Sequence, residues 1–186
     1  MPLAIFETSL GPCGLAWTAS GVVALQLPEE TPAATRARLV AKAIDADCPQ
    51  MRPSGAPQWV EDAVRRITEH LSGKLDPLDS VPLDLSRVSA FDVKVFRALQ
   101  ATRPGRTTTY GELALAVGSP GAARAVGRAM ATNPVPLLVP CHRVLAAGGR
   151  PGGFSAYGGL VTKERLLAIE NAPLWLRAPG QKSLFG

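Results

Sequence analysis

The sequence predicts an α+β protein in two parts. A small N-terminal α/β domain with an antiparallel β-meander is expected over residues 1–88, and a mostly helical, winged-helix-like domain with a helix-turn-helix is expected over residues 89–186. Three observations lead to this prediction. The chain opens with three short apolar runs, its second half shows apolar residues at helical spacing, and hydrophobic residues make up 46% of the chain, enough for a core.

The first thirty residues are typical of three consecutive strands. LAIFET, GLAWTA and VVALQLP are apolar, strand-like runs, and the turns LGPC and SG separate them. A helix is expected next over residues 32–44, and the Pro- and Gly-rich segment MRPSGAPQ after it is predicted to be a loop.

A second N-terminal helix is predicted over residues 57–72, because apolar side chains recur every four residues and a glycine follows. Residues 76–89, DPLDSVPLDLSRVS, carry two prolines and alternating leucines. We interpret them as a short strand followed by the linker between the two halves. The apolar positions of the helix predicted over residues 57–72 are Trp59, Ala63, Ile67 and Leu71.

The second half begins with a helix predicted over residues 90–102, which the following RPG interrupts. In TTTYGELALAVG, Thr109 and Glu112 have the spacing of a capping box, in which each residue satisfies a backbone N–H near the other. A helix is therefore expected from about Tyr110 to Gly118.

A further helix is expected directly afterwards, with Ser119 as its cap, Pro120 at its first position and its end near Thr132. Two helices joined by a tight Gly-Ser turn predict a helix-turn-helix.

The second of these two helices has one apolar face and one face of small residues. The small residues would let the helix backbone approach a large flat partner, and the flanking arginines could then reach phosphates or bases. Because alanine is abundant throughout the chain, a small-residue face without any such role is an equal alternative. The core face comprises Ala122, Val126, Ala129 and Met130, and the small face comprises Ala123, Gly127 and Ala131 beside Arg124 and Arg128.

The charge of the chain is unevenly distributed. Residues 1–88 hold 8 Lys and Arg against 11 Asp and Glu, whereas residues 89–186 hold 12 against 4. The basic second half favours a polyanionic partner, although an ordinary basic domain would have the same composition.

Several classes of protein are not indicated by the sequence. It has no apolar run of about 18 residues, as a membrane span requires, and Glu7 comes too early for a signal peptide. Three widely spaced cysteines, Cys13, Cys48 and Cys141, do not suggest a disulfide framework. We therefore expect a cytoplasmic protein.

The stretch NPVPLLVPCHRV places Cys141 next to His142 in a proline-stiffened segment after Asn133. A thiolate is the reactive form of cysteine, and a histidine can take the thiol proton, directly or through a water molecule. A buried, inert thiol is the alternative, since cysteines are often buried. Metal ligation and papain-like proteolysis have little support, because the chain lacks C-x-x-C spacing and has no histidine after residue 142.

The last predicted helix, LVTKERLLAIE, places Lys163, Leu166, Leu167 and Glu170 on one face. An acid that shares a face with buried leucines needs a partner, so Glu170 is a candidate to orient the histidine. A glutamate turned to solvent at the helix end is the alternative.

Four segments together resemble the O6-alkylguanine-DNA alkyltransferases, also called methylated-DNA–protein-cysteine methyltransferases. They are AFDVKVFRALQATRPGRTTTYGELA, AARAVGRAM, NPVPLLVPCHRV and GGLVTKERLLAIE, in that order between about residues 90 and 171. Over residues 1–88 the resemblance is loose. The resemblance of the four segments implies a DNA repair protein that flips an O6-alkylguanine out of double-stranded DNA. Such a protein transfers the alkyl group irreversibly to its own cysteine, as a monomer without a cofactor or metal.

The resemblance also implies residue roles. Cys141 would accept the alkyl group, His142 would deprotonate it through a water molecule, and Glu170 would complete the relay. Arg124 resembles the arginine that enters the duplex where the damaged base leaves. Tyr110 would hydrogen-bond the flipped base, Asn133 would brace the active-site segment, and the carbonyls of Cys141 and Val144 would read the exocyclic amine of the guanine. Further substrate-binding candidates are Phe154, Ser155 and Lys163, and the DNA-binding candidates are Ala123, Gly127, Arg128 and Ala131.

The chain departs from the family pattern in GGFSAYGG, residues 152–159. Phe154 stands where tyrosine is common, and Ala156 and Tyr157 resemble a two-residue insertion. The Ser155 N–H becomes the candidate donor to the guanine O6, and the tolerated alkyl size stays open. The zinc site of some relatives has no matching ligands.

Two other functions remain possible at this point. A related protein could bind the lesion without transferring the group, although such relatives lack the cysteine. A helix-turn-helix regulator could use Cys141 as an alkylation or redox sensor.

Overall fold

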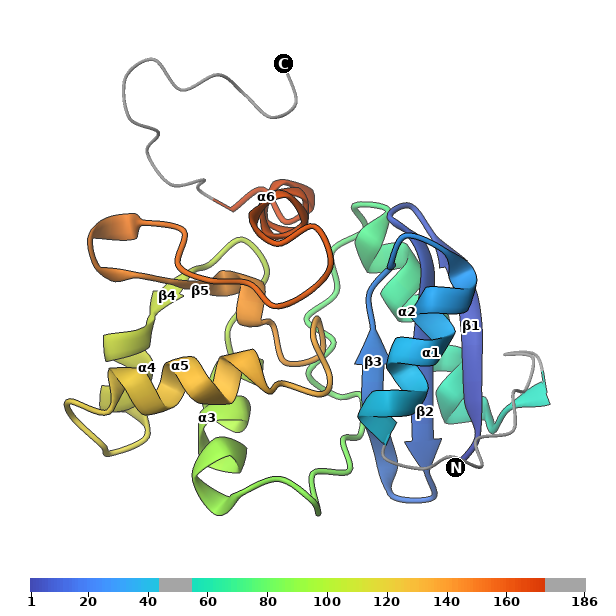
Figure 1. Cartoon of the computed structure of the whole chain (residues 1–186), viewed down its shortest axis with the longest axis horizontal. Coiled ribbons are helices and arrows are strands. Elements are labelled where there is room, and N and C mark those ends of the chain that lie inside the picture. Colours follow the sequence, from blue (N-terminus) through green and yellow to red (C-terminus); the bar gives the residue numbers. More distant parts are fainter. Residues whose placement is uncertain (44–54, 173–186) are drawn as a thin grey trace.

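The computed structural model describes residues 1–43 and 55–172. Cys48, residues 51–54 of the expected loop MRPSGAPQ, and residues 173–186 of the tail lie outside the described residues. Figure 1 shows two bodies side by side, one built on the N-terminal sheet and the other on the helices of the second half. This arrangement has the predicted α+β composition.

The N-terminal body is a three-stranded antiparallel sheet in the order β1-β2-β3. Its strands are β1 (Leu3–Thr8), β2 (Gly11–Thr18) and β3 (Gly21–Gln26), so the predicted meander is confirmed. Helix α1 (Pro32–Ala43) packs on one face of the sheet and α2 (Gln58–Leu71) packs on the other. Both faces carry apolar side chains, because successive residues of a strand point to opposite faces of the sheet. Gly14 permits the close approach of α1, because a Cβ there would lie 2.8 Å from Leu39 Cδ2.

The strand predicted within residues 76–89 is wrong. Leu83 forms only an isolated parallel bridge with Val22, in which Val22 N donates to Pro82 O (2.8 Å) and Asp84 N donates to Val22 O (2.9 Å). Proline has no N–H to continue a ladder, so Pro82 limits this segment to one bridge at the sheet edge.

The second half begins with α3 (Ala90–Gln100), capped by Ser89, and the short strand β4 (Thr108–Thr109) leads into α4 (Tyr110–Ala116). The predicted capping box is confirmed, since Glu112 N donates to Thr109 Oγ1 (3.2 Å) and Thr109 N donates to Glu112 Oε2 (2.7 Å). These reciprocal bonds fix the start of α4 at Tyr110.

Helix α5 (Ala123–Ala131) starts later than predicted, so Ser119 is not its cap and Pro120 is not its first residue. The carbonyl of Ser119 instead accepts a turn hydrogen bond from Ala122 N (3.1 Å). Gly121 has φ +85°, a left-handed backbone that cannot belong to an α-helix, and the helix begins only after it.

After α5, the chain runs through a loop into one turn of 3-10 helix, η2 (Cys141–Arg143), and then into β5 (Val144–Leu145). Strand β5 pairs in parallel with β4, with Thr108 opposite Val144 and Thr109 opposite Leu145, so the segment that leads into α4 lies beside the segment that follows η2. A second 3-10 turn, η3 (Ala147–Gly149), and the loop after it lead to α6 (Leu160–Ile169), which is seen nearly end-on at the top of the helical body in Figure 1.

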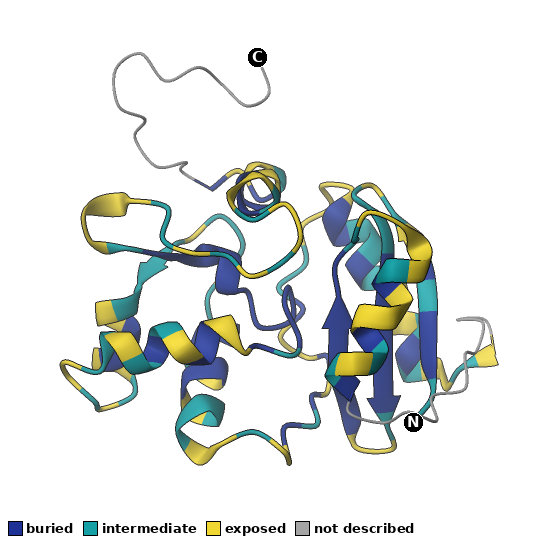
Figure 2. Ribbon diagram, in the orientation of Figure 1, coloured by how far each residue is buried: buried dark blue, intermediate teal, exposed yellow. Residues whose placement is uncertain are grey.

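Buried residues form a core that runs without interruption from the sheet into the helical half (Figure 2). The apolar faces of α3, α4 and α5 contribute Val95, Leu113 and Val126 to it. The division at residue 88 therefore stays a prediction. Of the helices in the two described ranges, none is both long enough and apolar enough to cross a membrane.

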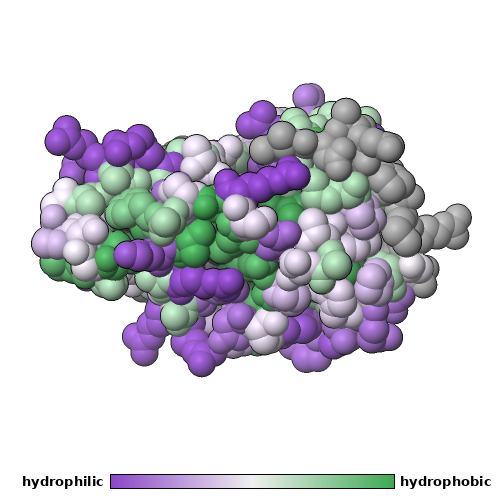
Figure 3. Space-filling model, turned by 90° about the horizontal axis from the view of Figure 1, so that it is seen from below, coloured by the Kyte–Doolittle hydropathy of each residue, from purple (hydrophilic) through white to green (hydrophobic). Residues whose placement is uncertain are grey.

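The surface also has apolar areas. Seen from below, hydrophobic residues gather over the C-terminal half and towards its junction with the N-terminal half, with hydrophilic side chains around them (Figure 3). This face therefore combines apolar contact area with polar margins.

Candidate active site

Cys141 lies at the start of η2 and is almost fully buried, with 6% of its surface exposed. Two cavities meet at this residue. One, of about 250 Å³, opens towards the N-terminal half and is lined by Gln26, Lys42 and Asn133 among others. The other, of about 240 Å³, lies between α5 and the loop before α6. Its lining consists of Tyr110, Gly127, Met130, Ala131, Cys141, Gly153, Phe154 and Ser155.

Asn133 holds the loop that carries the cysteine. Its side-chain amide donates to Val139 O (2.8 Å), and its Oδ1 accepts from Val135 N (3.0 Å). Cys141 N in turn donates to Val139 O (2.8 Å). The loop from the end of α5 to the sulfur is thus closed on itself by one buried side chain, which is the bracing position predicted for Asn133.

The sulfur is a protonated thiol at rest. Burial raises the pKa of the Cys141 thiol, and the hydrogen bond with Asn133 and the charges of Lys163 and Lys42 only partly oppose this. A thiol with a raised pKa needs a base before it can act as a nucleophile.

His142 has the geometry of such a base. Its Nε2 lies 2.9 Å from Glu170 Oε1, and its Nδ1 is buried without a hydrogen-bond partner among the described residues. Because the carboxylate is an acceptor, the ring hydrogen resides on Nε2, and Nδ1 keeps a free lone pair. Burial lowers the pKa of His142 despite the hydrogen bond to Glu170, so the ring is neutral and able to take a proton.

Glu170 is buried, so the alternative in which it faces solvent is wrong. Its carboxylate accepts from Arg143 Nε (2.9 Å) and Nη2 (2.7 Å), and Gly105 N lies 3.4 Å from Oε2. Burial alone would raise the pKa of Glu170, but its interactions with His142, His70 and Arg143 bring it well below its usual range. The group therefore carries a full negative charge beneath the histidine.

The C-terminal end of α6 fixes the direction of this carboxylate. The helix ends at Ile169, and Asn171 adopts a left-handed backbone with φ 53°. Ala172 N then donates to Leu167 O (2.9 Å), which closes the helix end as a C-terminal cap. Leu166, Leu167 and Glu170 point inwards together, as the predicted helix face requires.

Two residues at this site were missed by the sequence analysis. Arg143 is 1% exposed and pairs with both oxygens of Glu170, and its Nη1 also donates to Thr102 O. His70, from α2 of the N-terminal half, places Nε2 3.2 Å from Glu170 Oε1. Arg143 stands in the largely apolar stretch VPCHRVL, and an arginine buried there needs a carboxylate partner, so the sequence did contain a sign of this residue's role. No local pattern in the sequence distinguishes His70.

Lys163 is fully buried on α6, and its ammonium group bonds to carbonyls. Its Nζ donates to Val144 O (2.6 Å) and Pro151 O (2.5 Å). Burial lowers the pKa of Lys163 to about 8, opposed by the nearby Cys141. The predicted substrate-binding residue thus ties the wall loop to β5, and the carbonyl of Val144 is already engaged by it.

Tyr110 stands at the opening of the second cavity, half-buried, and burial raises the pKa of its hydroxyl while the N–H of Gly153 opposes this. Glycine is favoured beside it at residue 152, where the backbone has φ +68° and a Cβ would lie 3.1 Å from the Tyr110 hydroxyl. At Gly127 a Cβ would lie 3.9 Å from the ring, an ordinary contact distance.

The loop GGFSAYGG forms the outer wall. Phe154 and Ser155 line both cavities, and Ala156 lines the one towards the N-terminal half. Tyr157 is 51% exposed and its carbonyl accepts from Thr162 Oγ1 (2.6 Å), so this tyrosine lies at the surface. Ser155 lines the cavity.

The small-residue face of α5 is open to solvent next to the second cavity. Arg124, Arg128 and Ala131 are exposed, and Ala123 and Gly127 are partly so. The opposite face, with Val126, is buried. In the described ranges, no three His, Cys, Asp or Glu residues come together closely enough to hold a metal ion.

Residues 90–172 match the protein family described as 6-O-methylguanine DNA methyltransferase, DNA binding domain. A methylated-DNA–protein-cysteine methyltransferase of Mycolicibacterium paratuberculosis is 43% identical over 129 residues, which cover 69% of this chain and 73% of that protein. One from Mus musculus is 39% identical over 131 residues, 65% of this chain and 59% of that protein.

Solved structures agree over nearly the whole length. The OGT of Mycobacterium tuberculosis in complex with DNA superposes with a TM-score of 0.73 at 33% identity, covering 93% of this chain and 96% of the other. The O6-methylguanine-DNA methyltransferase of Pyrococcus kodakaraensis gives a TM-score of 0.69 at 27% identity, covering 91% and 99%.

Proposed function

The chain belongs to the methylated-DNA–protein-cysteine methyltransferase family, which repairs alkylated guanine in DNA by methyl transfer to the protein's own cysteine, and from this premise we propose that Cys141 is the acceptor. The observation that carries the assignment is the geometry of His142. Its Nε2 is bound to Glu170 while its Nδ1 has no hydrogen-bond partner among the described residues, and the preceding residue is a buried cysteine that lines two cavities.

The thiol proton leaves first. A water molecule between Cys141 Sγ and His142 Nδ1 passes it to the imidazole, and Glu170 stabilises the resulting imidazolium charge. The thiolate then attacks the alkyl carbon in an SN2 step, which forms the S–C bond and breaks the C–O bond to the guanine. Because a thioether is stable, each molecule acts once.

The flipped guanine would occupy the cavity between α5 and the loop 153–155. Tyr110 would donate a hydrogen bond to the base, and the Ser155 N–H would donate to O6, so that the departing guanine is stabilised as the C–O bond breaks. The carbonyls of Cys141 and Val144 would accept from the exocyclic amine. Lys163 acts indirectly, by holding Val144 and the wall loop in place.

DNA would bind along α5. Its exposed small residues let the helix lie in a minor groove, and extrusion of the base, at a cost of a few kcal/mol, would be offset by Arg124 entering the vacated stack. Arg128 would contact the phosphates. The basic charge of the second half fits this partner.

We place the protein, as a monomer, in the cytoplasm of a bacterial cell, associated with the nucleoid when it is bound to DNA. Residues 1–88 and 89–186 would be its two domains.

The test is mass spectrometry of the chain after incubation with a duplex that contains one O6-methylguanine. We expect one added methyl group on the peptide that contains Cys141 and none on the peptide with Cys13. Cys13 is the matched control, because it is also buried and burial raises its pKa to about 12. Tight lesion binding with an unmodified Cys141 peptide would instead indicate a protein that recognises the lesion without repairing it.

A further inference from the structure

A buried histidine of the N-terminal half contacts the carboxylate beneath the active site. We propose that His70 is a positioning residue for alkyl transfer, which holds Glu170 in the orientation that His142 requires; this inference rests on the proposed function. His70 lies near the end of α2, is fully buried, and places Nε2 3.2 Å from Glu170 Oε1. The alignment is that of a close electrostatic contact and falls short of an ideal hydrogen bond.

The tautomer of His70 is determined by the backbone. The N–H of Asp76 donates to His70 Nδ1 at 3.2 Å, so Nδ1 is an acceptor and the ring hydrogen lies on Nε2. That hydrogen is the one on the side of Glu170. The loop after α2 thus selects the form of His70 that faces the carboxylate with a donor.

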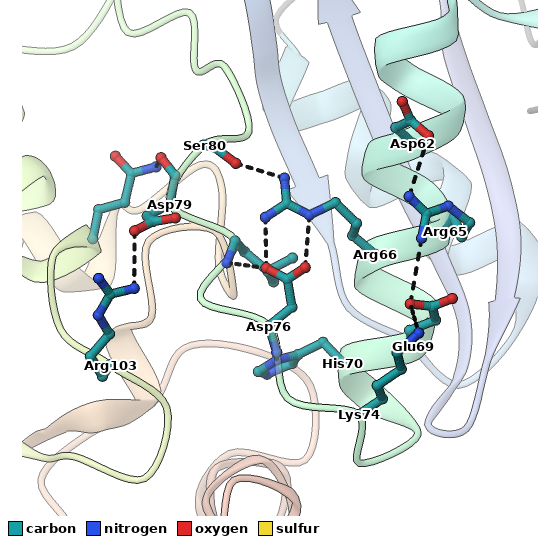
Figure 4. A network of polar contacts seen from close by, with 12 residues as sticks. Asp62, Arg65, Arg66, Glu69, His70, Lys74, Asp76, Asp79, Ser80 and Arg103 are labelled. Atoms are coloured by element: carbon teal, nitrogen blue, oxygen red, sulfur yellow. Dashed lines mark hydrogen bonds and ion pairs between the residues drawn. The ribbon is translucent and has the colours of Figure 1, made fainter.

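The position of Asp76 is itself fixed by a paired arginine on α2. Arg66 Nη2 and Nε donate to Asp76 Oδ1 (2.6 Å) and Oδ2 (2.8 Å), and Leu78 N donates to Oδ1 (2.8 Å). Figure 4 shows this pair directly beside His70, while Arg65 on another side of the helix contacts only Asp62 and Glu69 among the residues drawn. The histidine is therefore held at Nδ1 by a loop whose position the Arg66–Asp76 pair fixes.

Glu170 Oε1 is shared by three nitrogen atoms. His142 Nε2 lies at 2.9 Å, Arg143 Nη2 at 2.7 Å and His70 Nε2 at 3.2 Å. His142 and Arg143 both come from η2, so they would move together if this turn shifted. His70 belongs to the other half of the molecule, and it gives the carboxylate a reference point that is independent of η2.

The consequence is that the N-terminal half takes part in the chemistry. Without His70, the carboxylate could rotate towards Arg143 and lose its alignment with His142, whose basicity depends on it. The ionisable groups that face His70 are Glu170, His142 and Arg143 on one side and Asp76 with Arg66 on the other. His70 lines neither of the two cavities at Cys141, so it would act through Glu170 and not on the substrate directly.

The experiment compares His70→Phe with His70→Gln in the full chain. Phenylalanine keeps an aromatic ring at this position but removes both ring nitrogens of histidine. Glutamine keeps an N–H donor near the position of Nε2. We expect His70→Phe to lower the first-order rate of methyl transfer by roughly 10- to 100-fold, as misplacement of a reacting group by about 1 Å does. The Kd for the lesion duplex should stay within about twofold, and His70→Gln should retain most of the rate.

Two measurements separate positioning from a general structural effect. In a His142→Ala background, His70→Phe should cause no further loss of rate, because the carboxylate then has no base to orient. Arg65→Ala, on the same helix but outside this contact, should transfer at the wild-type rate. If His70→Phe reacts as fast as the wild type, or lowers the His142→Ala rate by the same factor, the inference is wrong.

Histidine nitrogen NMR on the wild-type chain gives a test that needs no variant to fold. We expect the hydrogen of His70 on Nε2, and a hydrogen on Nδ1 would overturn the inference. Failure of the proposed function would look different, since the wild-type chain would then leave Cys141 unmethylated in the same assay.

Discussion

Replacing Glu170 with glutamine removes a negative charge while keeping the shape of the side chain. The carboxylate accepts from both Arg143 nitrogens and from His142, and no part of its side chain is exposed. An amide has one acceptor and one donor end, so its NH₂ group must replace either Oε1, which accepts from His142 and Arg143, or Oε2, which accepts from Arg143. In either orientation the NH₂ group faces a donor of Arg143. Arg143, at 1% exposure, then keeps its charge without a counterion.

The expected loss of stability follows from the loss of this ion pair. Removing one partner of a buried ion pair costs about 3–5 kcal/mol. For a chain of this size, 1 kcal/mol shifts the Tm by about 2–4 °C, so Glu170→Gln should unfold roughly 6–20 °C below the wild type. The transfer rate should fall by about 10²–10⁴-fold, the usual contribution of a positioned acid–base pair.

The pH dependence of stability provides an independent check with a definite sign. The pKa of Glu170 is lower in the folded state than the value of about 4.3 in an unfolded chain. Its contribution is therefore fully present above about pH 4.3 and is lost as the pH falls below it. The difference in Tm between wild type and Glu170→Gln should be constant near neutral pH and shrink in acid.

Thermal unfolding followed by circular dichroism and single-turnover transfer to a lesion duplex measure the two effects. Glu69→Gln is a suitable control, since Glu69 makes only surface ion pairs with Arg65 and Lys74, and its Tm and rate should match the wild type. If Glu170→Gln unfolds at the wild-type temperature and transfers at the wild-type rate, the carboxylate has neither the structural nor the catalytic part assigned to it.

Four further outcomes are expected. Arg124→Ala should slow repair at limiting DNA and reduce the salt dependence of binding by about one charge. Lesion capture at the wild-type rate would contradict the placement of Arg124 in the base stack. Thr109→Ala should cost about 1 kcal/mol of stability in denaturant unfolding, because it removes the cap of α4; an unchanged midpoint would contradict the capping box. Gly152→Ala should destabilise the chain by about 1–2 kcal/mol and slow transfer, because its Cβ would lie 3.1 Å from the Tyr110 hydroxyl on a left-handed backbone, whereas Gly55→Ala, whose Cβ meets open space away from the site, should do neither. Finally, because burial lowers the pKa of His142, the transfer rate should stay constant on acidification to about pH 6.5 and fall only below it; a midpoint at or above 6.5 would show that the ring is not the buried base.

Local patterns in the sequence predict the structure correctly where the stabilising contact spans a few residues. The capping box of Thr109 and Glu112 closes within one helical turn, and the meander depends on strands joined by two-residue turns. The inward face of α6 follows from helical spacing alone, because residues three and four apart share one side of a helix. That spacing is sufficient to place Glu170 beside buried leucines.

The two local errors have equally local causes. Ser119 and Pro120 form a plausible helix start, but Gly121 in a left-handed backbone postpones α5 to Ala123. Leu83 alternates like a strand residue, but Pro82 leaves it a single bridge. In both cases one backbone restriction outweighed a favourable side-chain pattern.

By itself, the sequence determined the order of the elements, the neighbouring pair Cys141 and His142, and the helix face that Glu170 shares with two leucines, but it left open whether Glu170 faces solvent. Only the tertiary structure decided what surrounds that carboxylate. Arg143 and His70 reach the same oxygen from two different halves of the chain. The partner of a buried charge is chosen by packing across the whole chain, and no periodicity within one segment can contain that information.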